Sequence, residues 1–295
     1  MNAPRVAVIL LVAAACGVAS CGAPGPSSHP AANSDMLGMG DMPGMGPASA
    51  PPPLPEAAQH GAGLADNVGG YAFVPAADTV PAGAPSTFTF HITGPGGRTV
   101  TRYQPYESQL VLFDLIRSDL TGYVHIDPAM REDGTWEVAL PALPPGSYRA
   151  YTTFATPDAS AGKPLLYRLS HAFTVPGNAP AGTLPAPVAA TTVDGFTVTL
   201  ADKPKAGTST PLTIDIRRDG KPVGYFQRYL DGYAHLTAFH TGDLAVASLS
   251  PAGKVVGRQE LASDAMFPMS GTWRLFVEFR TSGPPHIAVF TIAVG

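Results

Sequence analysis

Apolar and polar residues alternate along most of the chain. From Gly70 on, short segments rich in Val, Thr, Phe and Tyr recur, among them STFTFHIT, SQLVLFDLI, TWEVAL and TWRLFVEF. Alternation with a period of two places successive side chains on opposite faces of a β-strand. Turn sequences, such as the Asp-Gly pairs at 133–134 and 219–220, separate the segments. No window shows a sustained helical period, so the pattern predicts an all-β protein of sandwich type.

The same strand pattern occurs twice. Residues 87–92 align with 211–216 and residues 146–151 with 271–276, at offsets of 124 and 125 residues. This internal repeat predicts two tandem modules, residues 70–176 and 191–295, joined by a linker at 177–190. The alternation also predicts the large core side chains of both modules: Phe88, Phe90, Tyr148, Phe154, Leu212, Ile214, Trp273 and Phe279.

The first 20 residues have the features of an export signal. Residues 6–19 form an apolar run that is too short for a membrane span and suits a secretory signal. The run ends in Val18-Ala19-Ser20-Cys21, which resembles the lipobox of bacterial lipoproteins. That resemblance implies acylation of Cys21 and a lipid anchor at the extracytoplasmic face of the cell membrane. Plain signal cleavage or a retained anchor remains the alternative.

Residues 21–69 have the composition of a tether. Residues 22–66 contain nine Pro and eight Gly, with no Lys, Arg or aromatic residue. Such a segment cannot bury enough apolar surface to offset its chain entropy, so we expect it to be disordered.

Four methionines recur at every third position of this predicted arm. Gly and Pro between them exclude a stable helix, and a soft thioether is a ligand suited to Cu(I). The pattern resembles the Met-rich motifs of bacterial envelope copper-handling proteins, which implies copper binding, although a compositionally biased linker remains the other interpretation. The candidate ligands of the arm are Met36, Met39, Met42 and Met45, with His29 and His60 on either side.

Composition excludes several functional classes. Charged residues make up 14% of the chain and the net charge is −4, which does not suit a nucleic-acid binder. Cys16 and Cys21 are the only cysteines, so neither module has a disulfide or a thiolate metal site. The chain contains no H-E-x-x-H, G-x-S-x-G or P-loop motif, and we expect no catalytic activity.

The segments DLTGYVHIDP, PPGSYRAYTTF and YLDGYAHL resemble a family of actinobacterial envelope lipoproteins with tandem immunoglobulin-like modules, some of them associated with metals. The family pattern carries H-x-H-P in each module. Here the first module reads His125-Ile126-Asp127-Pro128 and the second Ser248-Leu249-Ser250-Pro251. One histidine of the first pair is replaced by Asp, and both histidines of the second pair are replaced by Ser. His125 and Asp127 still share one side of the strand. With His235, which the resemblance also carries as His, they form a secondary metal site if the modules bring them together.

Two functional hypotheses follow. The first is a lipid-anchored envelope protein that binds or buffers metal, copper before others, on the extracytoplasmic side. The second is a non-catalytic interaction module for an envelope protein partner, in which the arm is only a tether. In both, the N-terminal lipid provides contact with the membrane, and nucleic acid has no part.

Overall fold

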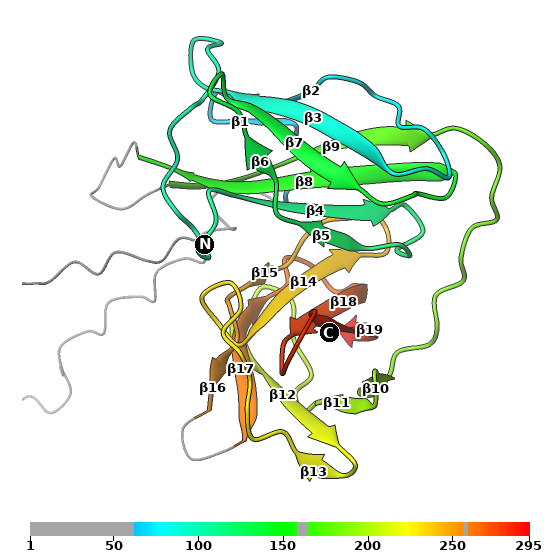
Figure 1. Ribbon diagram of the computed structural model, residues 1–295. Helices are drawn as coiled ribbons and strands as arrows, with labels where there is room; N and C mark the ends of the chain where they lie inside the picture. The colour runs from blue at the N-terminus through cyan, green and yellow to red at the C-terminus, as the bar shows by residue number, and fades with distance from the viewer. Residues whose placement is uncertain (1–61, 158–164, 256–258) are drawn as a thin grey trace, which may run out of the picture. The chain divides into compact units, whose positions relative to one another are not determined.

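The computed structural model of the chain describes residues 62–157, 165–255 and 259–295 (Figure 1). These residues form antiparallel β-sheets and no helix, so the all-β prediction is confirmed. None of them lies in a helix with the length and apolar character of a membrane span. The predicted signal, Cys21 and the candidate ligands of the arm (His29, Met36, Met39, Met42, Met45 and His60) lie outside the described residues.

The first module is an immunoglobulin-like sandwich of two sheets. One sheet has the strand order β1-β2-β3-β7-β6, and the other has the order β5-β4-β8-β9. The strands are β1 (Asn67–Val68), β2 (Tyr71–Pro75), β3 (Ser86–Thr93), β4 (Val111–Arg117), β5 (Val124–Ile126), β6 (Ala129–Met130), β7 (Thr135–Leu140), β8 (Gly146–Thr156) and β9 (Leu165–Val175).

The second module repeats this architecture. Its sheets have the orders β10-β11-β12-β17-β15 and β14-β18-β19, with β13 paired to β12 and β16 paired to β17. The strands are β10 (Ala190–Val193), β11 (Phe196–Leu200), β12 (Thr210–Arg218), β13 (Lys221–Pro222), β14 (Ala234–His240), β15 (Ser248–Leu249), β16 (Gly253–Lys254), β17 (Glu260–Met266), β18 (Gly271–Phe279) and β19 (His286–Val294).

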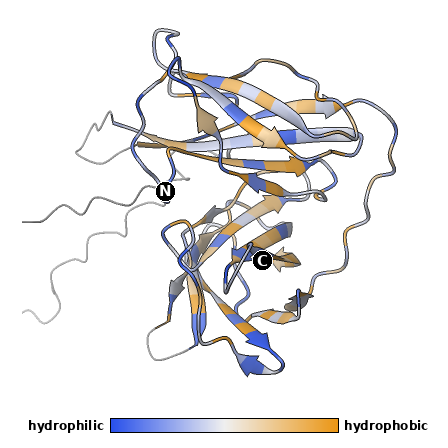
Figure 2. Ribbon diagram, in the orientation of Figure 1, coloured by the Kyte–Doolittle hydropathy of each residue, from blue (hydrophilic) through white to orange (hydrophobic). Residues whose placement is uncertain are grey.

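The core of each sandwich follows the alternation in the sequence. Along β12 every second side chain is buried, and Figure 2 shows the matching bands of apolar and polar residues. The prediction of large core residues is confirmed, because all eight are buried: Phe88, Phe90, Tyr148, Phe154, Leu212, Ile214, Trp273 and Phe279. The two sandwiches therefore have separate hydrophobic cores.

The same kind of local hydrogen bond, from an aromatic side chain to the backbone, occurs at equivalent positions of the two modules. The Tyr148 hydroxyl donates to the carbonyl of Pro144 at 2.9 Å, and Trp273 Nε1 donates to the carbonyl of Met269 at 3.2 Å. Both bonds join an aromatic residue near a strand start to the backbone four residues upstream, which resembles the tyrosine corner of immunoglobulin-like folds. The duplication read from the sequence thus extends to specific contacts.

The segment before the first sandwich is more ordered than the predicted tether. Residues 67–68 form β1, and Ala62 and Leu64 lie against the core of the second sandwich. The Ala62 carbonyl accepts a hydrogen bond from the Val246 amide at 2.9 Å. The composition predicts a tether that extends to residue 69. Composition alone does not reveal that a few apolar residues, here Ala62 and Leu64, pack against a distant part of the chain.

The linker is fixed to the first sandwich at its start. Arg117 donates hydrogen bonds to the carbonyls of Ala179 and Pro180, and it pairs with Asp119 at 2.7 Å. Asp119 in turn accepts from the Gly182 amide at 2.7 Å. The first residues of the linker are therefore held by side chains from the end of β4 and the turn after it.

Candidate metal centre

Equivalent sheets of the two sandwiches face one another. Every residue of β4 is buried, as are all but the last of β14, because one face of each strand lies in its own core and the other lies between the sandwiches. The apolar part of this interface consists of buried residues contributed by both modules: Ile116, Leu120, Tyr151, Phe239, Val246 and Phe276. Strands with two buried faces leave no exposed position, so any polar side chain on them must find partners inside the protein.

Beside these apolar residues the interface holds a polar cluster. Four of its members come from the first sandwich (Glu107, Asp114, Tyr123 and His125), and four come from the second (Tyr229, His235, Thr237 and Glu278). Three of the members, Glu107, Asp114 and Glu278, are carboxylates that are at most 8% exposed to solvent. Burying three carboxylates is costly unless cations or hydrogen-bond donors compensate them.

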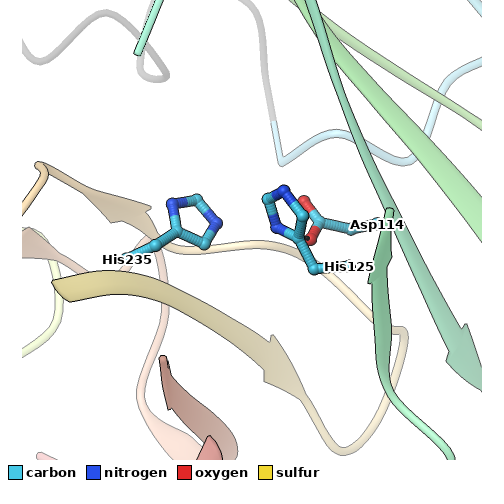
Figure 3. Close-up of side chains that lie close together, drawn as sticks. All are labelled: Asp114, His125 and His235. Atoms are coloured by element: carbon cyan, nitrogen blue, oxygen red, sulfur yellow. Dashed lines mark ion pairs between the residues drawn. The ribbon is translucent and has the colours of Figure 1, made fainter. Parts of the chain in front are cut away.

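Strand pairing sets Asp114 beside His125. The two residues are directly opposite in the register of β4 and β5, and His125 Nδ1 lies 3.3 Å from Asp114 Oδ1 (Figure 3). The His125 side chain is 3% exposed, and burial disfavours its charge. The carboxylate of Asp114 outweighs this, with smaller contributions from Glu278 and Asp127, and the pKa of His125 rises to about 9. Burial likewise opposes the charge on Asp114, yet His125 holds the pKa of Asp114 below its ordinary value.

His235 approaches the same point from the second sandwich. It lies on β14, and its ring centroid is 4.7 Å from that of His125, with the two ring planes nearly perpendicular. His235 Nδ1 is 2.9 Å from Glu107 Oε2, and Nε2 is 3.1 Å from the Thr237 hydroxyl. A carboxylate on one imidazole nitrogen fixes the ring orientation, as outer partners do for metal-binding histidines.

Asp114, His125 and His235 together form a group of potential metal ligands. One donor atom from each residue lies within 4.8 Å of the other two, and Figure 3 shows the side chains converging from the two modules. Donors about 2.1 Å from an ion are at most about 4.2 Å apart, so the group would contract by roughly half an ångström around one.

Tyr123 joins the carboxylates of the two sandwiches. Its hydroxyl is 2.8 Å from both Asp114 Oδ1 and Glu278 Oε1, and 3.2 Å from Thr237 Oγ1. The Tyr229 hydroxyl donates to the other oxygen of Glu278 at 3.1 Å. Burial and the two carboxylates raise the pKa of Tyr123 well above its ordinary value, so this phenol stays protonated.

His125 is the unsatisfied member of the cluster. Among the described residues, neither of its ring nitrogens has a partner in hydrogen-bonding geometry, although both are buried. Buried polar atoms without partners are rare and call for an explanation, such as an ion. A cavity of about 20 Å³ lies beside the cluster; Glu107, Asp114, His235 and Arg168 are among the residues that line it, and His125 is not. That volume accommodates one water molecule or ion.

The structure brings together two of the three residues of the predicted secondary site, His125 and His235. The third potential ligand in their group is Asp114, whereas the prediction names Asp127. Asp127 is largely exposed, and its carboxylate is 3.9 Å from His125 Nε2. The prediction relied on neighbours along one strand, whereas β5 pairs with β4 and places Asp114 directly opposite His125.

Sequence reasoning missed all three buried acids of the cluster, Glu107, Asp114 and Glu278. A signal for two of them exists: Asp114 interrupts the apolar run of LVLFDLI, and Glu278 interrupts that of LFVEF. An acid within an otherwise apolar strand indicates a buried polar contact. Three further histidines instead pair with single carboxylates nearer the surface: His171 with Asp78, His240 with Asp243 and His286 with Asp194.

A family model matches part of the chain. Residues 191–295, the predicted second module, match a family described as "Domain of unknown function (DUF8832)". No curated protein sequence matches the chain.

Solved structures similar to the chain include two bacterial adhesins. The Escherichia coli adhesin FdeC is 17% identical over 77% of this chain, at a TM-score of 0.24. The Yersinia pseudotuberculosis adhesin InvE is 15% identical over 76% of this chain, at a TM-score of 0.21. The chain spans 65% and 59% of those two structures. At these identities and TM-scores the likeness supports no conclusion about this chain.

Proposed function

We propose that this chain is a lipid-anchored envelope protein that binds a metal ion between its two sandwiches. The observation that carries the metal site is the group formed by Asp114, His125 and His235, in which both nitrogens of the buried His125 ring have no hydrogen-bond partner among the described residues. The envelope location rests on the lipobox-like sequence that ends in Cys21.

Charge at the cluster favours a divalent cation. The carboxylates of Glu107, Asp114 and Glu278 are buried, and the guanidinium of Arg168 lines the adjoining cavity. With neutral imidazoles this leaves two negative charges, which one divalent ion neutralises. Without an ion, protonation of His125 is the alternative compensation, so metal and protons compete for the site.

The donor set also restricts the metal. Two imidazoles and a carboxylate suit divalent zinc, copper, iron or nickel, and the Irving–Williams order places Cu(II) highest. Soft Cu(I) prefers sulfur ligands, so the predicted Cu(I) site of the methionine arm would be a separate one. Copper remains the metal we propose for this protein, with Cu(II) as the form held between the sandwiches.

Titration of the mature chain with Zn(II) and, separately, Cu(II) tests the proposal. Zn(II) is the cleaner probe because thioethers do not suit it. We expect His235→Ala and Asp114→Asn each to lose one equivalent of bound metal, while replacement of Met36, Met39, Met42 and Met45 by Leu leaves that equivalent in place. His171→Ala is the matched control, since His171 also pairs with a carboxylate but lies outside the cluster.

Circular dichroism of each variant separates loss of binding from loss of fold. If the folded His235→Ala and Asp114→Asn chains bind as much Zn(II) and Cu(II) as the wild type, the interface is not a metal site. The interaction-module hypothesis then becomes the better account of the sandwiches.

A further inference from the structure

Residues 62–65, here called the strap, contact both sandwiches beside the cluster. The Ala62 carbonyl accepts from the Val246 amide of the second sandwich at 2.9 Å. The Ala65 carbonyl accepts from the Ser170 amide of the first at 2.9 Å, and the Leu64 carbonyl accepts from Arg149 at 3.1 Å. Three of the four residues thus accept hydrogen bonds through their carbonyls, one from the second module and two from the first.

The strap also lies against the wall of the cavity. Gly63 is buried, and a Cβ at this position would be 2.8 Å from Arg168 Cδ and 3.7 Å from Val246 Cγ2. Arg168 and Val246 both line the cavity. Arg168 further crosses the interface, donating to Thr153 on its own sandwich and to the Ala247 carbonyl on the other.

From these contacts we infer that the strap regulates the metal site: docking of residues 62–65 holds Arg168 and Val246 in place, and release of the strap opens the cavity. This inference rests on the proposed metal binding. By linkage, an ion that binds best with the strap docked must in turn stabilise the docked strap. The strap lies near the end of the predicted tether (21–69), so tension or a partner acting on the residues before the strap would favour metal release.

Gly63→Val is the substitution that tests docking of the strap most directly. The φ of Gly63, +72°, lies in the left-handed region, and a Cβ would meet Arg168, so Gly63→Val opposes docking on both counts. Leu64→Ala is a milder second variant that removes apolar contact with the second core. Val188→Ala, at an exposed position in the linker, is the control.

The experiment measures transfer of Zn(II) from the loaded mature chain to a chromogenic chelator. We expect Gly63→Val to release Zn(II) about tenfold faster, which corresponds to the net free energy of about one hydrogen bond. The number of Zn(II) ions bound at saturation should not change. Hydrogen exchange gives the reciprocal readout: Zn(II) should slow exchange of the Val246 and Ser170 amides, which donate to the strap. The control should release Zn(II) at the wild-type rate.

The outcomes separate the two proposals. A wild-type chain that binds no Zn(II) and no Cu(II) overturns the metal site and the regulation with it. A chain that binds Zn(II) but shows equal release from Gly63→Val and wild type, with no change in amide exchange, overturns the strap alone.

Discussion

At the scale of single residues, His125 couples the interface to pH. Its folded pKa is about 9 against an ordinary value of 6.5, so folding favours the protonated ring. A raised pKa gives stability that is fully present below pH 6.5 and is lost as the pH rises through about 9. Asp114, the nearest carboxylate, stays ionised over this window because its own pKa is lowered.

Metal-free protein should therefore lose up to about 3 kcal/mol of unfolding free energy between pH 6.5 and 9. Urea unfolding in the presence of a chelator, repeated across this range, measures the slope. His125→Gln should flatten it, and Asp127→Asn should change it little, since Asp127 is exposed and contributes less than Asp114. Equal slopes in wild type and His125→Gln would assign the pH dependence to another group.

The residue scale also shows where sequence reasoning ends. The sequence singles out His235 and His125 as histidines that two modules could bring together, and they do meet. The apolar run around Asp114 indicates a buried polar contact but does not identify its partner, because the place of Asp114 opposite His125 depends on the pairing of β4 with β5. Pairing partners are fixed by tertiary structure, and alternation along a strand carries no information about them.

At the scale of elements, turns follow their sequence closely. Asp219-Gly220 forms the two-residue loop between β12 and β13, and both residues have positive φ, as a type I′ hairpin requires. Gly134 follows Asp133 in the other predicted Asp-Gly turn and has a φ of +85°. The two glycines differ in their surroundings: a Cβ at 134 would lie 2.6 Å from Thr99 Cγ2, and one at 220 would meet nothing within 4 Å.

This difference predicts unequal effects of the same substitution. Gly220→Ala should cost about 1 kcal/mol, which is the usual penalty for placing a side chain in the left-handed region. Gly134→Ala should cost roughly 1–3 kcal/mol more, because the methyl group must displace Thr99 and the Val100 carbonyl. Denaturant midpoints of the two variants test this, and equal losses would contradict the crowding around Gly134.

The strand β15 pairs differently from β5, its equivalent in the first module. In the alignment of the two modules, Ser248 is equivalent to His125. The bridge between Phe239 and Val246 continues the register in which β4 pairs with β5 in the first module. From Ser248 on, however, the second module pairs with β17 in the opposite sheet. Alignment of the halves predicts the strand but not this change of partner, which removes the equivalent of His125 from the interface.

At the scale of the whole molecule, the interface should make the two sandwiches unfold together. Phe276 is buried there and stacks on Tyr123, with ring centroids 4.2 Å apart. A charge at this position would be buried without a partner. We expect calorimetry to show one transition for the wild type and two for Phe276→Asp, because the cores themselves are separate.

Tyr225→Asp is the control for this prediction, since Tyr225 is 65% exposed. It should retain the single transition of the wild type. Two transitions in the wild type would mean that the interface contributes too little to couple the modules.

The equivalence of the facing sheets bears on how such a site can arise. Ile116 and Phe239, as well as Tyr151 and Phe276, are matched positions of the repeat that meet in one apolar cluster. A single ancestral module pairing with its own copy would use this same surface twice, and every residue on it would be present in both partners. Leu112 and His235, or Asp114 and Thr237, occupy matched places yet differ in chemistry. Fusion of two such copies into one chain would release these positions from identity, and it would make an asymmetric set of polar side chains at the interface accessible.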